Sequence, residues 1–169
     1  MTLKKLLPAI VAGLVIGIVE IIPFIKSLTC CILVPFAVYY AMTLEVKGNK
    51  KSEPFSLGEG IRLGILTGIF GAFFAVFFDS FLTFVLRSND FVAAFPQMEA
   101  FIENFSVPEE TKREILSMLQ AIAEDIKTTG FSAVYTLSML VSNLIFNIIL
   151  GIIGGLIGIK FANKKFFYN

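Results

Sequence analysis

The chain has 169 residues, of which 56% are hydrophobic, and its 14 basic residues nearly balance its 13 acidic residues, giving a net charge of +1. This composition leaves too few polar residues to cover a soluble globule of this size, so it excludes an ordinary soluble domain. It also excludes nucleic acid as a partner, because no basic stripe interleaved with aromatic residues runs along the chain. We therefore expect a membrane protein whose first partner is the lipid bilayer.

Four apolar runs in the sequence are long enough to cross a bilayer, which takes about 20 mostly apolar helical residues. They cover residues 6–25, 28–44, 61–86 and 131–159. The runs are continuous and do not alternate with polar residues, which predicts helices and not the strands of a barrel. The sequence thus predicts an all-α polytopic membrane protein, a four-helix bundle of transmembrane helices forming a single membrane domain over 1–169.

The first run has to be compared with a cleaved signal peptide, because Lys4 and Lys5 precede it. Glu20 and Pro23 lie inside the run, and no small-residue cleavage site follows it. These features favour a retained helix, which we count as the first span.

Two adjacent cysteines, Cys30 and Cys31, stand at the start of the second run. Neighbouring cysteines are badly placed to bridge each other, and the chain, which has no histidine, shows no metal-ligand spacing. We expect the pair to pack as small buried side chains. Thiol chemistry, or a disulfide to a partner, is the alternative.

The orientation of the spans is predicted from their basic flanks, because Lys and Arg gather on the cytoplasmic side of a membrane. With four spans, most of the basic flanking residues fall on one side: Lys4, Lys5, Lys47, Lys50, Lys51, Arg62, Lys160, Lys164 and Lys165. We predict a multi-pass protein of the bacterial inner membrane with both the N- and the C-terminus in the cytoplasm.

The segment between the third and fourth runs, residues 87–130, is acidic, with eight carboxylates against four basic residues. Apolar residues recur in it at helical spacing, and Ser106 with Glu109 has the pattern of a capping box. We predict an external amphipathic helical hairpin over about 90–128. It packs on the outer ends of the spans, or it offers a partner surface that includes Glu109, Glu110 and Glu114.

Small residues form stripes on three of the predicted membrane helices, including the pattern Gly-x-x-x-Gly. Helices in lipid gain little from burying apolar surface on one another, so close backbone approach at small residues holds them together. The glycines expected at these contacts are Gly13 and Gly17, then Gly64, Gly68 and Gly71, then Gly151, Gly154 and Gly158.

Four polar residues fall inside the predicted spans: Glu20, Asp79, Asn143 and Asn147. Counting inward from the basic flanks at about 1.5 Å per residue brings them to nearly the same depth. A carboxylate at depth is costly, so these side chains are expected to face inward and form a polar cluster. The cluster fixes the register of the helices, or, alternatively, it is a cation or proton site.

The order of features along residues 55–165 resembles an uncharacterised bacterial family of small four-span membrane proteins. The matching features are Ser56-x-x-Glu59-Gly60 before the glycine stripe of the third run, the acidic insertion from Ser106-x-x-Glu109-Glu110, and a last span that ends in Lys164-Lys165. The adjacent cysteines depart from the pattern of that family. The resemblance implies architecture, with no activity to carry over.

The function expected from the sequence is that of an accessory or interaction subunit of a membrane complex, with a protein partner or as a homo-oligomer. The alternative is a minimal transporter or channel for an ion or small solute, which would use the polar cluster. We do not expect an enzyme, because the chain has no histidine, no paired catalytic motif and no cofactor signature. Accordingly, no catalytic residue, metal site or cofactor is predicted.

Overall fold

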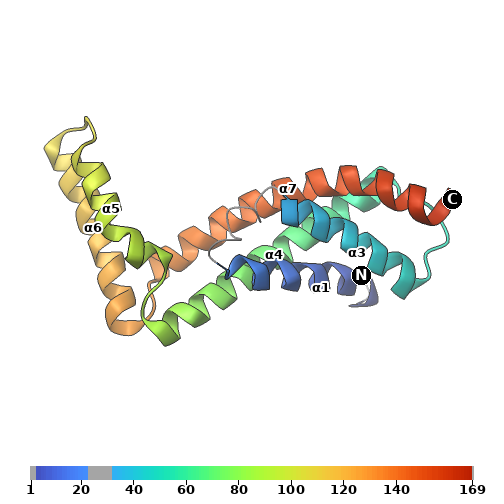
Figure 1. Ribbon diagram of the computed structural model, residues 1–169, viewed down its shortest axis with the longest axis horizontal. Helices are drawn as coiled ribbons and strands as arrows, with labels where there is room; N and C mark the ends of the chain where they lie inside the picture. Colours follow the sequence, from blue (N-terminus) through green and yellow to red (C-terminus); the bar gives the residue numbers. More distant parts are fainter. Residues whose placement is uncertain (1–2, 23–31, 169) are drawn as a thin grey trace. The chain divides into compact units, whose positions relative to one another are not determined.

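The computed structural model describes residues 3–22 and 32–168, and within these residues it consists of six α-helices without a strand (Figure 1). The all-α class predicted from the sequence is confirmed. The helices are α1 (Leu3–Glu20), α3 (Val34–Asn49), α4 (Leu57–Leu86), α5 (Asp90–Glu103), α6 (Glu109–Thr129) and α7 (Ala133–Phe167).

Helices occupy all four places where membrane spans are predicted, but their lengths differ from the prediction. Helix α4 has 30 residues and α7 has 35, and both are apolar enough to cross a membrane. Helix α1 has 18 residues that include Lys4, Lys5 and Glu20, and α3 has 16 residues. The structure therefore supports two candidate spans, and the prediction of four is not supported.

The predicted limits of the first two spans extend beyond the helices that are described. Helix α1 ends at Glu20, and the predicted end at residue 25 lies outside the described residues. The predicted start of the second span at residue 28, with Cys30 and Cys31, also lies outside them.

The chain divides into two compact units, and the single membrane domain expected from the sequence stays a prediction. The first unit comprises Met1–Phe78 and Leu140–Asn169, and the second comprises Asp79–Met139. The first unit thus holds α1, α3, most of α4 and the later part of α7. The second holds the end of α4, the helices α5 and α6, and the start of α7.

In the first unit, α1 packs against α3 through small side chains such as Ala9, Ala12 and Ala41, all fully buried. A proline inside α1 explains one tether between the two helices. Pro8 has no N–H group to donate to the carbonyl of Lys4 one turn earlier. The side-chain amide of Asn49, the last residue of α3, donates to that carbonyl instead, at 3.2 Å.

The start of α4 carries a capping box. The Ser56 backbone N–H donates to the Glu59 carboxylate at 2.9 Å, and the Glu59 N–H lies 3.3 Å from the Ser56 hydroxyl oxygen, which accepts from it. This satisfies donors that a helix leaves free in its first turn. Lys51 adds an ion pair to Glu59 at 2.7 Å.

The capping box predicted at Ser106 and Glu109 is wrong. Helix α6 begins after Pro108, which is the N-cap residue and provides no side-chain hydrogen bond. The Glu109 carboxylate accepts instead from Lys112, at 2.8 Å, and Lys112 also donates to the carbonyl of Glu103 at 2.9 Å. The lysine therefore joins the end of α5 to the start of α6.

The segment before α4 is fastened to the last turns of α7. The Phe55 N–H donates to the side-chain oxygen of Asn163 at 2.8 Å, and the amide of Asn163 donates back to the Phe55 carbonyl at 3.0 Å. The first turn of α1 and the last turns of α3 and α7 consequently lie at the same end of the first unit (Figure 1).

In the second unit, α5 and α6 occupy the predicted 90–128 segment and pack against each other. Asn89 caps α5 by accepting from the Val92 N–H at 3.0 Å. Helix α6 ends at Thr129, and the cap residue that follows, Gly130, has a φ of +79°, a left-handed conformation that suits glycine. A side chain there would also meet the Phe84 backbone of α4, its carbonyl oxygen at 2.7 Å, so the turn approaches α4 closely.

Candidate functional site

The glycines of α1 lie against the backbone of α4. A Cβ atom added at Gly13 would meet Cβ of Phe70 at 2.6 Å, and one added at Gly17 would meet Cβ of Phe74 at 2.5 Å. Gly71 of α4 faces the side chain of Ile16 in return, at 3.1 Å. Only residues without side chains allow two helices to approach this closely.

Helices α4 and α7 touch backbone to backbone. Gly64 lies on Gly151, Gly68 lies on the backbone of Asn147, and Gly60 lies on Gly155. Gly60 and Gly155 are not among the glycines predicted from the sequence to lie at helix contacts. Gly60 is one turn before Gly64 and Gly155 one turn after Gly151, so helical spacing could have identified both.

The remaining two glycines of α7 face α3. A Cβ atom at Gly154 would meet Cα of Pro35 at 2.5 Å, and one at Gly158 would meet the sulfur of Met42 at 3.0 Å. Helix α7 therefore uses one set of glycines for α4 and another for α3.

The predicted polar residues make different contacts. Asp79 belongs to the second unit, where its carboxylate accepts a hydrogen bond from the Tyr135 hydroxyl at 3.2 Å. Asn147 belongs to the first unit and is buried against α4, and its amide nitrogen has no hydrogen-bond partner among the described residues. Glu20 and Asn143 are partly exposed residues of the first unit. The clustering of all four stays a prediction.

Tyr135 is a site residue that the sequence analysis missed, because it is 56 positions from Asp79 along the chain. Its ring also packs on Phe91 of α5, with 5.7 Å between ring centroids. Within residues 3–22 and 32–168, no group of three acidic or thiol side chains could hold a metal ion.

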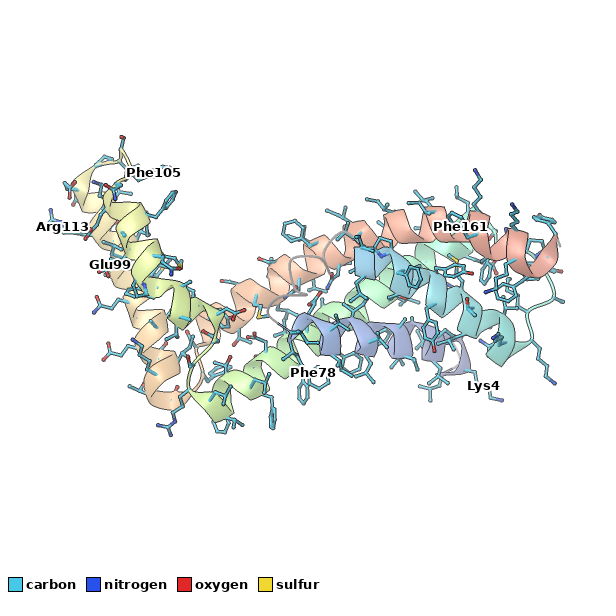
Figure 2. All side chains as sticks on the ribbon, viewed as in Figure 1. Lys4, Phe78, Glu99, Phe105, Arg113 and Phe161 are labelled. Atoms are coloured by element: carbon cyan, nitrogen blue, oxygen red, sulfur yellow. The ribbon has the colours of Figure 1, made fainter. Side chains whose placement is uncertain are left out.

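A large apolar groove runs between α3 and α7 in the first unit, with a volume of about 660 Å³. Its walls include Pro35 and Phe36 on α3 and Ile153, Ile157 and Phe161 on α7. Phe161 is labelled on α7 in Figure 2. Two lysines of α7, Lys164 and Lys165, line the groove as well. From the sequence, these lysines are predicted as a basic flank at the end of the last span, and no groove is predicted beside them.

A smaller apolar groove, of about 250 Å³, lies on α5. It is lined by Ala94, Gln97, Met98, Phe101 and Ile102, which share one helical face. The structure describes every residue of α5, and none of them is fully buried. Figure 2 shows Glu99 on α5, and Phe105 and Arg113 near the connection between α5 and α6.

The predicted partner residues Glu109, Glu110 and Glu114 are exposed at the start of α6. Glu109 has a lowered pKa, because its carboxylate accepts a hydrogen bond from Lys112 and lies beside that positive charge. The Glu109 carboxylate is therefore ionised at neutral pH.

Comparisons with family models, with curated proteins and with solved structures found no match to this chain. The resemblance to a family of small four-span membrane proteins therefore stays a prediction.

Proposed function

We propose that this chain is an integral membrane protein that acts as an accessory subunit, with its first unit in the bilayer and its α5 groove docking a partner protein. The proposal combines two lines of support, one for the membrane location and one for the docking surface.

The membrane location is supported by the outward-facing side chains of α4 and α7. Of the most apolar 18 residues in each helix, only 28% in α4 and 22% in α7 are buried. A core helix of a soluble protein buries most of its apolar residues, whereas here side chains such as Phe77 and Phe146 point outward. Lipid is the solvent that suits such a surface.

We propose that α1 and α3 lie in the bilayer beside α4 and α7, as the four-span prediction has it. Both carry exposed apolar residues, among them Val15 and Ile18 on α1 and Phe36 on α3. The 18 residues of α1 are about 27 Å long, close to the roughly 30 Å of a hydrocarbon core. Its charged residues lie at its two ends, where water or lipid head groups are within reach.

The docking role rests on the unpartnered apolar groove of α5. Phe101, on its wall, leaves 65% of its surface exposed, and its ring contacts that of Phe105, with 5.3 Å between centroids. An exposed aromatic pair beside an apolar groove is typical of a protein interface.

The charges around the groove favour a protein over a membrane surface as its occupant. Glu99 and Glu103 are exposed on α5, and Glu109, Glu110 and Glu114 on α6. An anionic membrane repels such carboxylates, whereas a partner with an apolar centre and a Lys- or Arg-rich rim complements them.

A photo-crosslinking amino acid in place of Phe101, in the native membrane, tests the docking role. The matched control places the same group at Lys127, an exposed residue near the other end of α6. We expect a discrete adduct with a second protein at Phe101 and none at Lys127. Changing Glu109, Glu110 and Glu114 to Lys should lower the adduct yield, because the rim charges set the encounter rate.

Two outcomes would overturn the docking role. One is an adduct whose mass equals two copies of this chain, which would make the groove a contact within a homo-oligomer. The other is equal labelling at Phe101 and Lys127, which would mean that nothing specific occupies the groove.

A further inference from the structure

The geometry points to a lipid site between α3 and α7: we propose that this groove holds one anionic phospholipid, with an acyl chain along its apolar wall and the phosphate beside Lys164 and Lys165. The inference uses the membrane location proposed above, and it does not depend on the docking role of α5.

The dimensions of the groove suit a lipid chain. Its volume of about 660 Å³ falls within the roughly 300–1,000 Å³ of ligand pockets. Its wall on α7 runs from Leu150 to Lys164, and these 15 residues span about 21 Å along the helix. That length exceeds the hydrocarbon depth of one leaflet, about half of 30 Å.

The distribution of polarity along the groove matches an amphiphile. From Leu150 to Phe161 the α7 wall is apolar, with Ile153 and Ile157 between them, and the two lysines follow at its end. A lipid has the same order, a long apolar chain and then a charged group. A partner helix or a second copy of this chain would match the groove only if its contact surface were apolar throughout and carried acidic groups at one end, beside the lysines.

The charge at the end of the groove selects an anionic lipid. None of the residues lining the groove is acidic. Within residues 3–22 and 32–168, neither Lys164 nor Lys165 forms an ion pair, and Lys165 lies 5.4 Å from the centre of the Phe166 ring. Two ammonium groups attract a phosphate and repel the cationic head of a zwitterionic lipid.

The neighbouring glycines explain why the groove exists. Gly154 and Gly158 bring α7 against Pro35 and Met42 of α3 on one side of the helix. Ile157 and Phe161, on the adjacent side of α7, have bulky side chains that prevent an equally close approach to α3. A groove that is open to the outside therefore remains between them and Phe36. In a membrane, that opening faces lipid.

Native mass spectrometry of the full chain tests the proposal. The protein is released from micelles that contain equal amounts of phosphatidylglycerol and phosphatidylcholine with identical acyl chains. We expect one retained phosphatidylglycerol adduct. Each lysine near a phosphate contributes about fivefold to affinity, so Lys164→Gln with Lys165→Gln should weaken the preference for phosphatidylglycerol by about thirtyfold.

The matched control is Lys50→Gln with Lys160→Gln, which removes the same charge from the first unit without touching the groove. It should keep the preference for phosphatidylglycerol. A second variant, Ile157→Trp, fills the apolar wall and keeps both lysines, and it should reduce retention of both lipids. Because Ile157, Lys164 and Lys165 are all exposed, these variants should fold.

Three outcomes would overturn the proposal. Equal retention of the two lipids would indicate ordinary solvation by lipid. Loss of the adduct with millimolar inorganic phosphate would indicate a site for the phosphate group alone. An unchanged adduct in Ile157→Trp would place the bound lipid elsewhere. Each result is independent of whether α5 crosslinks to a partner.

Discussion

Gly64 has no room for a side chain, because α4 and α7 meet there backbone to backbone. A Cβ atom at this position would lie 2.7 Å from the carbonyl carbon of Gly151. We expect Gly64→Ala to push the helices apart and lower the free energy of unfolding by about 1–3 kcal/mol. Unfolding of the purified protein in mild detergent with increasing sodium dodecyl sulfate measures the change.

The control for this prediction is Gly58→Ala, in the same helix. A Cβ atom at Gly58 has nothing within 4 Å, and alanine favours a helix over glycine by about 1 kcal/mol. Gly58→Ala should be neutral or stabilising. Equal destabilisation by both changes would mean that the α4–α7 contact does not form.

The ion pair of Glu109 with Lys112 should make the stability of the α5–α6 hairpin depend on pH. The hydrogen bond and charge of Lys112 lower the pKa of Glu109 in the folded chain. The pair therefore stabilises the hairpin above the ordinary carboxyl pKa, and this stabilisation is lost as the pH falls through the lowered pKa. We expect Lys112→Met to return the Glu109 pKa to its usual range, as measured by NMR titration.

Lys127→Met removes a positive charge from the other end of α6 and serves as the control. It should leave the Glu109 titration unchanged. If Lys127→Met changed the Glu109 pKa as much as Lys112→Met does, the lowered pKa would result from the net charge of the hairpin and not from the contact with Lys112.

At the scale of the elements, the tether between α1 and α3 should depend on Pro8. Asn49→Ala removes the donor to the Lys4 carbonyl and should cost about 1 kcal/mol. In Pro8→Ala, the new N–H at position 8 can donate to that carbonyl, so the cost of Asn49→Ala should fall. A double-mutant cycle measures this coupling and subtracts the separate bond from Asn49 to Glu45. Additive effects would contradict the tether.

The sequence predicts the places and type of these elements well, because continuous apolar runs indicate helices directly. It predicts their ends poorly. Ser56 and Ser106 both have an acidic residue three positions later, yet the capping box forms only at Ser56. At Ser106 the intervening Pro108 becomes the N-cap, and Lys112 takes the Glu109 carboxylate. Local pattern alone does not reveal such competition.

The contacts of the candidate sites were less predictable still. Helical spacing shows that Gly151 and Gly154 could serve helix packing, but it does not show that one faces α4 and the other α3. For the same reason, the sequence did not predict the hydrogen bond between Tyr135 and Asp79 or the groove between α3 and α7. Each of these depends on which helices become neighbours, and one sequence does not contain that information locally.

At the scale of the whole molecule, the topology proposed here is testable. Lys50, after α3, should be cytoplasmic, because it belongs to the basic end of the first unit, and Glu110, in α6, should be external. Reporter fusions that are active on only one side of the membrane, placed at these two residues, decide the matter. Activity of a cytoplasmic reporter at both Lys50 and Glu110 would overturn the four-span proposal, since α4 would then not cross.

The clasp between Phe55 and Asn163 joins residues 108 positions apart and has a consequence for biosynthesis. When α4 leaves the ribosome, the α7 surface that covers Gly60, Gly64 and Gly68 has not yet been made. At about 5–20 residues per second, roughly 5–20 s pass before it is available. During that interval the glycine face of α4 is not covered by α7. We expect the nascent chain to remain bound to the insertion machinery until α7 has been synthesised and can pack on α4.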